Sequence, residues 1–217
     1  LVERWGREVF ARHFGTADLV GFVNWTMLPF MSDIWEAVQA ELCPQLDGPR
    51  RKIFFDLADP EKRPDAEIER ALNLILRFQP HFEVILGLNE KEAREVGATL
   101  GIPAGGDGRE DVMALAAAIR ARVPVEAVVV HPVRFAGCVS SQCTEIVDGP
   151  FVAKPTITTG AGDHFNAGHC FGKLLGFSDS ESLLLGVATS GAYVRSGLSP
   201  QAGDLIRLLR QWPAAEA

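Results

Sequence analysis

Gly160-Ala161-Gly162-Asp163-His164-Phe165-Asn166-Ala167-Gly168 is the stretch from which the rest of this 217-residue chain can be interpreted. It follows the β-branched residues 157–159 and precedes a helix-compatible segment that runs to about Leu175, so an extended segment is predicted to turn into a helix here. Without side chains at Gly160 and Gly162 the backbone can approach a ligand closely, and the first N–H groups of the helix have no helical acceptor. Such a turn binds anions, including phosphoryl groups.

Asp163 is predicted to lie in the first helical turn, where the positive end of the helix dipole favours its ionised carboxylate. An anion-binding turn beside a carboxylate can transfer a phosphoryl group to a hydroxyl. The pattern is not a P-loop, because no Lys followed by Ser or Thr stands at the required place, and Phe165 occupies the third glycine position of the dinucleotide fingerprint. The alternative is a helix start whose glycines only permit the turn and whose Asp163 only offsets the dipole.

The run Thr158-Thr159-Gly160-Ala161-Gly162-Asp163, followed by Phe165 and Ala167-Gly168, resembles the C-terminal signature of the ribokinase-like (PfkB) carbohydrate kinase family. The resemblance implies an anion hole formed by Gly160, Ala161 and Gly162, with Asp163 as the catalytic base. Many members carry Asp immediately before the two threonines, where it helps to bind a monovalent cation. Ile157 stands there in this chain, so the potassium site of the family is not carried over.

Asn89-Glu90-Lys91-Glu92 opens a predicted helix directly after an apolar strand at 83–88. Asn followed three residues later by Glu is the pattern of a capping box, which satisfies the N–H groups at a helix start and needs no ligand. The resembled family has the same pattern at this place, where it organises magnesium and phosphate through water. We favour this second role for Asn89 and Glu92, and a cap is compatible with it.

The resemblance also implies contacts with the nucleotide. The matching helix of the family lines the adenine pocket, and close helix packing explains the small residues of the predicted helix at 183–194 equally well. Where the family has a Gly-x-x-Gly stretch over the nucleotide, this chain has Pro132-Val133-Arg134-Phe135-Ala136, in which Arg134 is either a phosphate contact or a surface residue. The residues predicted to bind the nucleotide are Thr159, Asn89, Glu92, Ala188 and Gly191.

A second family motif is matched only in part. Asp59-Pro60-x-x-Arg63 follows a predicted strand, but Glu61 stands where the family usually has Asn. The alternative is that Pro60 only breaks the chain before a helix while Arg63 is solvated, and we favour that alternative.

Apolar runs and helical patterns alternate along the chain. Strands are predicted at 17–24, 52–56, 83–88 and 127–131, with short antiparallel strands at 135–140 and 144–147. The alternation predicts the α/β class, with a mainly parallel, doubly wound sheet that carries helices on both faces and binds ligands outside the carboxyl ends of its strands. This agrees with the ribokinase-like fold that the resemblance implies for residues 53–212.

The composition of the chain excludes several classes of binding partner. The net charge is −7 and no cluster of Lys and Arg occurs, which argues against nucleic-acid binding. No apolar run approaches the roughly 20 residues needed to span a membrane, and no secretory leader pattern opens the chain. The cysteines are predicted to be buried, reduced thiols that fit a cytoplasmic location; they are Cys43, Cys138, Cys143 and Cys170.

We therefore predict that residues 1–217 form a single α/β domain. Because the chain opens on Leu1 and family members extend further on the N-terminal side, we expect it to be the C-terminal, nucleotide-binding portion of a longer kinase. The predicted function is transfer of the γ-phosphoryl group of ATP, with Mg²⁺, to a hydroxyl of a sugar or similar small molecule. A homodimer is compatible with the family.

Two rival functions follow from particular residues. A non-catalytic ribokinase-like protein, which binds a ligand or regulates a partner, is favoured by Ile157 and by the segment 132–136. A metal-dependent hydrolase that uses His164 and His169 is disfavoured, because residues five apart do not share one face of a helix.

Overall fold

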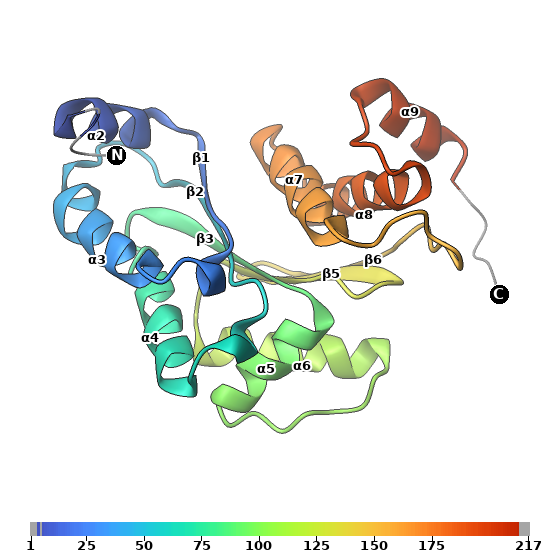
Figure 1. Cartoon of the computed structure of the whole chain (residues 1–217), viewed down its shortest axis with the longest axis horizontal. Coiled ribbons are helices and arrows are strands. Elements are labelled where there is room, and N and C mark those ends of the chain that lie inside the picture. The colour runs from blue at the N-terminus through green and yellow to red at the C-terminus, as the bar shows by residue number, and fades with distance from the viewer. Residues whose placement is uncertain (1–3, 5, 213–217) are drawn as a thin grey trace. The chain divides into compact units, whose positions relative to one another are not determined.

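The computed structural model describes Arg4 and residues 6–212 (Figure 1). The chain folds into two compact units, and the boundary between them falls after Val128, inside a strand. Strands and helices alternate through the first unit, whereas the second unit combines a strand hairpin with three helices.

The first unit is built on a parallel sheet. Its strands lie side by side in the order β1 (Leu19–Phe22), β2 (Arg51–Asp56), β3 (Phe82–Leu88) and β4 (Ala127–Val130). The pairs β1–β2 and β2–β3 are parallel, and Phe55 of β2 lies opposite Phe22 on one side and Leu86 on the other. Ile53, Phe54 and Phe55 are at most 1% exposed, as expected for a parallel strand that is covered on both faces.

Helices of the first unit bury apolar faces against this sheet. They are α2 (Arg7–Thr16), α3 (Met31–Glu41), α4 (Asp65–Leu76), α5 (Glu90–Thr99) and α6 (Arg109–Arg122), with short 3₁₀ turns η1 (Trp25–Met27), η2 (Cys43–Gln45) and η3 (Pro60–Lys62). Aromatic rings fill one side of the core, where Trp35 of α3 meets Phe55 edge-on at 5.0 Å and Phe78 lies 5.4 Å from Phe55. Phe54 faces the opposite side and packs over Gly87, where an added Cβ would lie 2.4 Å from its ring.

Unusual backbone conformations follow the carboxyl ends of β1 and β2. Asn24, Ala58 and Asp59 have φ angles of 63°, 58° and 55°, in the left-handed region that residues other than glycine rarely adopt. Such residues are costly and concentrate at functional sites in proteins. The carboxyl edge of the first unit therefore contains strained turns.

The second unit begins in β4. Its hairpin comprises β5 (Phe135–Ser140) and β6 (Thr144–Asp148), which pair in antiparallel fashion. Three helices follow, α7 (Ala161–Leu174), α8 (Asp179–Ser196) and α9 (Ala202–Arg210) (Figure 1). The packing of α7 on α8 depends on small residues, because a Cβ added at Gly168 would lie 2.4 Å from the Thr189 hydroxyl and 2.7 Å from the Leu185 carbonyl oxygen.

The predicted α/β class with a mainly parallel sheet is confirmed, and the strands at 135–140 and 144–147 are antiparallel as expected. Thr156, just before the turn, donates to the carbonyl oxygens of Val194 and Arg195 at the end of α8. Two local expectations are wrong. Helix α8 begins at Asp179, four residues before the predicted start, because Ser178 and Glu181 form a capping box. Cys143 is exposed.

No helix among the described residues combines the length and the apolar character that crossing a bilayer requires.

Candidate active site

The glycine turn of the second unit has the geometry that its sequence predicts. Gly160 is the N-cap of α7 and has a φ of 86° and a ψ of 2°, a left-handed conformation suited to glycine. An added Cβ at Gly160 would lie 3.3 Å from the Tyr193 hydroxyl oxygen. Both the backbone conformation and the nearby phenol therefore favour glycine at this position.

The backbone donors of this turn differ in what they contact. The amide of Ala161 donates to the Thr158 carbonyl oxygen at 3.1 Å, and the first helical bond runs from His164 N to the Gly160 carbonyl oxygen at 3.1 Å. Helix geometry provides no acceptor for the amides of Gly162 and Asp163, which belong to the first turn. These two amides are the donors best suited to an anion. The Ala161 amide already donates to Thr158, so it could contribute to the predicted anion hole only by sharing its hydrogen between that carbonyl oxygen and the anion.

Asp163 lies in the first turn of α7 and is exposed. Its neighbour Phe165 is buried and stacks on the His131 ring, with 4.5 Å between the centroids. Burial lowers the pKa of His131 to about 4, so this imidazole is neutral at physiological pH. His131 also borders the turn, since a Cβ added at Gly162 would lie 3.5 Å from its Cε1 atom.

His164 is the residue of the turn that sequence analysis missed. The sequence suggests for it only the disfavoured role of a metal ligand beside His169, which lies on the same helix but is 1% exposed. In the structure the His164 ring lies 2.7 Å from the Gly160 carbonyl oxygen and stacks on Tyr193. The contact with Gly160 could have been predicted from the sequence, because a histidine four residues after a helix-capping glycine can reach back to the cap. Nothing in the sequence pairs it with Tyr193.

In the first unit, Asn89 and Glu92 form the capping box that their spacing predicts. The Asn89 side-chain oxygen accepts from Glu92 N at 2.9 Å, and Glu92 Oε2 accepts from Asn89 N at 2.8 Å. The second carboxylate oxygen, Glu92 Oε1, accepts from Asp59 N at 3.1 Å. Glu92 is 5% exposed; burial raises the pKa of its carboxyl, and the two amide donors act in the opposite direction. Glu92 thus joins the strained turn after β2 to the start of α5.

The hydrogen bonds of Asn89 and Glu92 also indicate whether these two residues suit Mg²⁺. Across residues 4 and 6–212, no group of three His, Cys, Asp or Glu side chains is arranged to hold a metal ion directly. Each oxygen of the Glu92 carboxylate already accepts a backbone N–H, but a carboxylate oxygen has two lone pairs. The donor set therefore fits a hydrated Mg²⁺ that is contacted through water better than a directly ligated one.

The partial motif around Arg63 is structural. Its Nε donates to the Thr26 carbonyl oxygen at 3.0 Å, an Nη pairs with Glu67 at 2.8 Å, and its guanidinium lies 5.0 Å from the centre of the Trp25 ring. The side chain is 16% exposed, so the favoured expectation that it is solvated is wrong. It anchors the turn after β1 to α4, a contact between residues far apart in the sequence.

Three of the residues predicted to bind the nucleotide lie in the second unit. Ala188 is fully buried in α8, and a Cβ added at Gly191 would lie 2.3 Å from Pro150, so both positions take part in close packing. Thr159 borders the turn and its carbonyl oxygen accepts from the Tyr193 hydroxyl at 2.9 Å. Arg134, proposed as an alternative phosphate contact, lies over the Phe151 ring at 3.8 Å from its centre.

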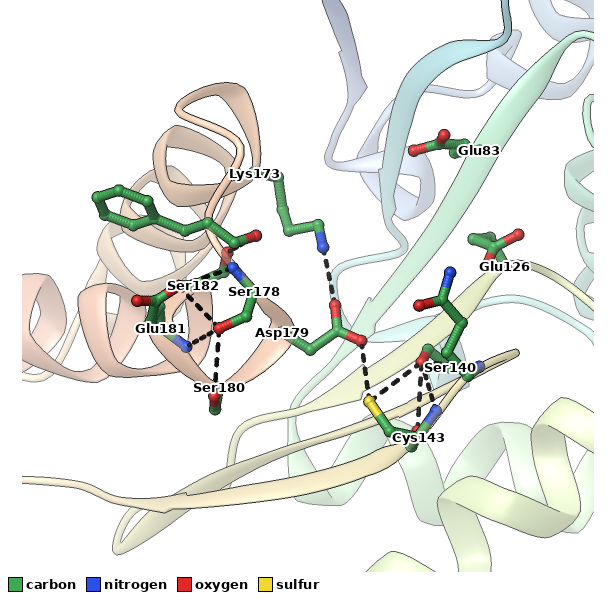
Figure 2. A network of polar contacts seen from close by, with 12 residues as sticks. Glu83, Glu126, Ser140, Cys143, Lys173, Ser178, Asp179, Ser180, Glu181 and Ser182 are labelled. Atoms are coloured by element: carbon green, nitrogen blue, oxygen red, sulfur yellow. Dashed lines mark hydrogen bonds and ion pairs between the residues drawn. The ribbon is translucent and has the colours of Figure 1, made fainter.

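A polar network that sequence analysis did not single out fixes the start of α8 (Figure 2). Lys173 of α7 donates to Asp179 at 2.7 Å, and the Cys143 thiol donates to the other oxygen of Asp179 at 3.6 Å. Burial alone would raise the pKa of Asp179, but the Lys173 ammonium holds it below its usual range. The network ties the β5–β6 turn to the two helices.

Comparisons with known proteins agree with the ribokinase-like signature. The model of the prokaryotic ketohexokinase family matches residues 1–212. A ketohexokinase from Haloferax volcanii is 28% identical over 202 residues, which cover 93% of this chain and 52% of that protein. This chain therefore spans about half the length of that relative.

Solved structures show the same fold. The ribokinase of Arabidopsis thaliana, complexed with ribose and ATP, gives a TM-score of 0.70 at 18% identity, covering 94% of this chain and 59% of that chain. The ribokinase of Thermotoga maritima gives 0.66 at 18% identity, with 92% and 59% covered. At these identities the likeness establishes the ribokinase-like fold.

Proposed function

This chain belongs to the prokaryotic ketohexokinase family, and we propose on that premise that its protein transfers the γ-phosphoryl group of ATP to a sugar hydroxyl. The observation that supports the proposal most directly is the turn at Gly160, whose left-handed backbone leads into a helix with Asp163 exposed in its first turn. The name of the Haloferax volcanii relative suggests a ketohexose as the acceptor.

In the proposed mechanism Asp163 accepts the proton of the attacking hydroxyl. A carboxylate is a weak base, but phosphoryl transfer has a loose transition state that requires positioning and charge stabilisation more than basicity. The anion hole of Gly160, Ala161 and Gly162 would donate hydrogen bonds to oxygens that gain charge, with the Gly162 amide the best placed of the three.

For the first unit we propose that Asn89 and Glu92 hold Mg²⁺ through water. When bound, Mg²⁺ would supply positive charge to the phosphate oxygens of ATP. Thr159 is proposed to contact the nucleotide, and Ala188 and Gly191 to hold α8 in place for it. A cytoplasmic location and a homodimer also stay predictions.

The test is a coupled assay of ADP release by the protein encoded by the complete reading frame that contains residues 1–217. The panel contains fructose and other ketohexoses, glucose, ribose and adenosine, each with ATP and Mg²⁺. We expect kcat/KM for one ketohexose to exceed that for glucose at least tenfold. ATP binding by calorimetry without turnover of any acceptor would contradict the proposal and support the non-catalytic alternative.

A further inference from the structure

Two aromatic side chains hold the carbonyl groups of the anion-binding turn from one side. The Tyr193 hydroxyl donates to the Thr159 carbonyl oxygen at 2.9 Å, and His164 Nδ1 lies 2.7 Å from the Gly160 carbonyl oxygen. The two rings stack, with 3.6 Å between their centroids and an interplanar angle of 10°. Two successive peptide groups are thus bound by two side chains that also contact each other.

The partners of His164 define its tautomer. The Gly160 carbonyl oxygen can only accept a hydrogen bond, so Nδ1 must carry the proton that it donates. The other ring nitrogen, Nε2, lies 2.9 Å from the Ser199 hydroxyl oxygen and in the neutral ring accepts from it. Ser199 follows α8, so the loop beyond that helix orients the imidazole.

Holding a carbonyl also orients an amide. In a trans peptide the N–H points opposite to the C=O of the same plane. The Thr159 carbonyl shares its peptide group with the Gly160 amide, and the Gly160 carbonyl shares its group with the Ala161 amide. With the first carbonyl directed to Tyr193, the Gly160 amide is directed away from the aromatic pair.

The glycine makes such support necessary. Gly160 has a φ of 86°, and a glycine has access to more backbone conformations than any other residue. Rotation of the Thr159–Gly160 peptide group would replace the Gly160 N–H with a carbonyl oxygen, which repels a phosphoryl oxygen. Rotation of the Gly160–Ala161 group would break the hydrogen bond from the Ala161 amide to the Thr158 carbonyl oxygen, which closes the turn. The side-chain bonds from His164 and Tyr193 oppose both rotations, in addition to the helical bond that the His164 amide donates to the Gly160 carbonyl oxygen at 3.1 Å.

We propose that His164 and Tyr193 are positioning residues that hold the Gly160 turn in the one conformation in which the Gly160 amide, next to the Gly162 amide at the start of α7, can donate to a phosphoryl group. The inference rests on the proposed function, because it assigns to the turn the role of an anion hole. Neither side chain needs to touch the substrate. Their contribution is to hold the peptide groups of Thr159 and Gly160 in one orientation before the anion arrives.

Substitutions in the protein from the complete reading frame separate the hydrogen bonds from the stack. Tyr193→Phe keeps the ring and removes the donor to Thr159, and His164→Phe keeps a ring and removes the donor to Gly160. We expect each to lower kcat roughly tenfold with the KM for the sugar within about twofold, because misplaced donors weaken transition-state binding. His164→Asn, whose amide can donate to Gly160, should recover part of the loss.

Ser180→Ala is the matched control, because Ser180 lies in the first turn of the same helix as Tyr193 and its hydroxyl contacts Ser178 at 3.3 Å. It should leave kcat unchanged. Equal melting temperatures with reduced kcat in the His164 and Tyr193 variants would support positioning. Parental kcat in both variants would overturn the inference, as would a fall in melting temperature with no change in kcat.

A phosphate titration keeps this result separate from failure of the proposed function. Tyr193 is the only tyrosine of residues 1–217, and its signal is identified by its absence from Tyr193→Phe. In protein labelled with ¹³Cζ-tyrosine, its resonance can be followed as inorganic phosphate is added. We expect a saturable shift in the parent protein and at least threefold weaker phosphate binding in His164→Phe.

If the parent turns over no acceptor but shows this pattern, the proposed function fails and the inference stands. No phosphate-dependent shift, or equal phosphate affinity in His164→Phe, would overturn the inference whether or not the protein is a kinase.

Discussion

Asp163 is the residue on which the proposed reaction depends most. Asp163→Asn should lower kcat by about 10² or more and leave the Kd for the nucleotide nearly unchanged, as expected when a general base is removed. The melting temperature should change little, because the side chain is exposed and its interaction with the helix dipole is worth at most about 1 kcal/mol. Steady-state kinetics, calorimetry with ATP and thermal unfolding give the three values.

Asp204→Asn is a suitable control for that substitution. Asp204 also lies in the first turn of a helix, α9, where it caps the helix and pairs with Arg207. The control should retain parental kcat. Turnover by Asp163→Asn close to that of the parent would contradict the assignment of the base.

Glu92 allows a capping role and a magnesium role to be measured separately. Both of its oxygens accept backbone amides, from Asp59 and Asn89, whereas a glutamine has one acceptor oxygen and would place an N–H₂ group against the second amide. Glu92→Gln should therefore reduce the free energy of unfolding by about 1–3 kcal/mol. If the carboxylate also attracts hydrated Mg²⁺, the concentration needed for half activity should rise.

Urea unfolding and a magnesium titration of kcat test this prediction. Glu90→Gln is the control, since Glu90 is in the same helical turn and pairs with Arg94; it should affect neither quantity strongly. Lower stability of Glu92→Gln with unchanged magnesium dependence would show that Glu92 is a cap alone.

Among the elements, the pair α7 and α8 carries the turn, and small residues bring the two helices together. Gly168→Ala would place a methyl group 2.4 Å from the Thr189 hydroxyl, and Gly191→Ala would place one 2.3 Å from Pro150. We expect each to lower the free energy of unfolding by about 1–3 kcal/mol, because overpacked cores force side chains and backbone to shift.

Nucleotide binding by Gly191→Ala distinguishes the two interpretations of α8. If Gly191 serves packing, the Kd for ATP in the folded variant stays within about twofold of the parent, and only the melting temperature falls. A tenfold weaker Kd at unchanged stability would place Gly191 in the nucleotide site. Gly203→Ala in α9 is the control. The added Cβ would lie no closer than 3.8 Å to its nearest neighbour, a guanidinium nitrogen of Arg207, and alanine favours a helix.

On the scale of the whole molecule, the two units differ in how strongly acid destabilises them. In the second unit burial lowers the pKa of His131 and His169 to about 4, and the Lys173 charge adds to the effect at His169. Unfolded histidines bind a proton near pH 6.5, so between pH 6.5 and 4 the unfolded chain binds more protons than the folded one. The stability that these histidines provide is complete above pH 6.5 and is lost as the pH falls toward 4.

In the first unit Glu92 and Glu95 have raised pKa values, whereas the hydrogen bond with Lys91 lowers the pKa of the Glu61 carboxyl. Burial and the neighbouring Glu61 carboxylate raise the pKa of Glu95 to about 7, and burial raises that of Glu92. A carboxyl whose pKa is higher in the folded state stabilises the fold when protonated, and that contribution is lost as the pH rises through the folded value. Protonation of Glu92 and Glu95 in mild acid therefore stabilises the folded first unit, and protonation of Glu61 opposes this effect.

We predict that lowering the pH from 7.5 to 5 destabilises the second unit more than the first, by an amount of order 1–2 kcal/mol for each of these two histidines. Urea unfolding can follow the ¹³C resonance of Tyr193 for the second unit and ¹⁹F-tryptophan resonances of Trp25 and Trp35 for the first. His169→Gln should reduce the pH dependence of the Tyr193 transition. Equal shifts of the two sets of signals would contradict the prediction.

The sequence by itself determined the order of strands and helices, the glycine turn at residue 160 and the capping box at Asn89. Each of these depends on residues close together in the chain, such as the apolar run of β2 or the spacing of Asn89 and Glu92. The family signature added Asp163 as the candidate base. Local patterns suffice here because helix periodicity, capping and glycine turns are local interactions.

Only the tertiary structure decided which groups support those motifs. The second oxygen of Glu92 contacts Asp59, and the carbonyl of Thr159 is bound by Tyr193, 34 residues further along the chain. For the same reason Thr156, just before the turn, is bound to the end of α8. These contacts arise when distant segments pack together, and the periodicity of a single segment does not encode its partner.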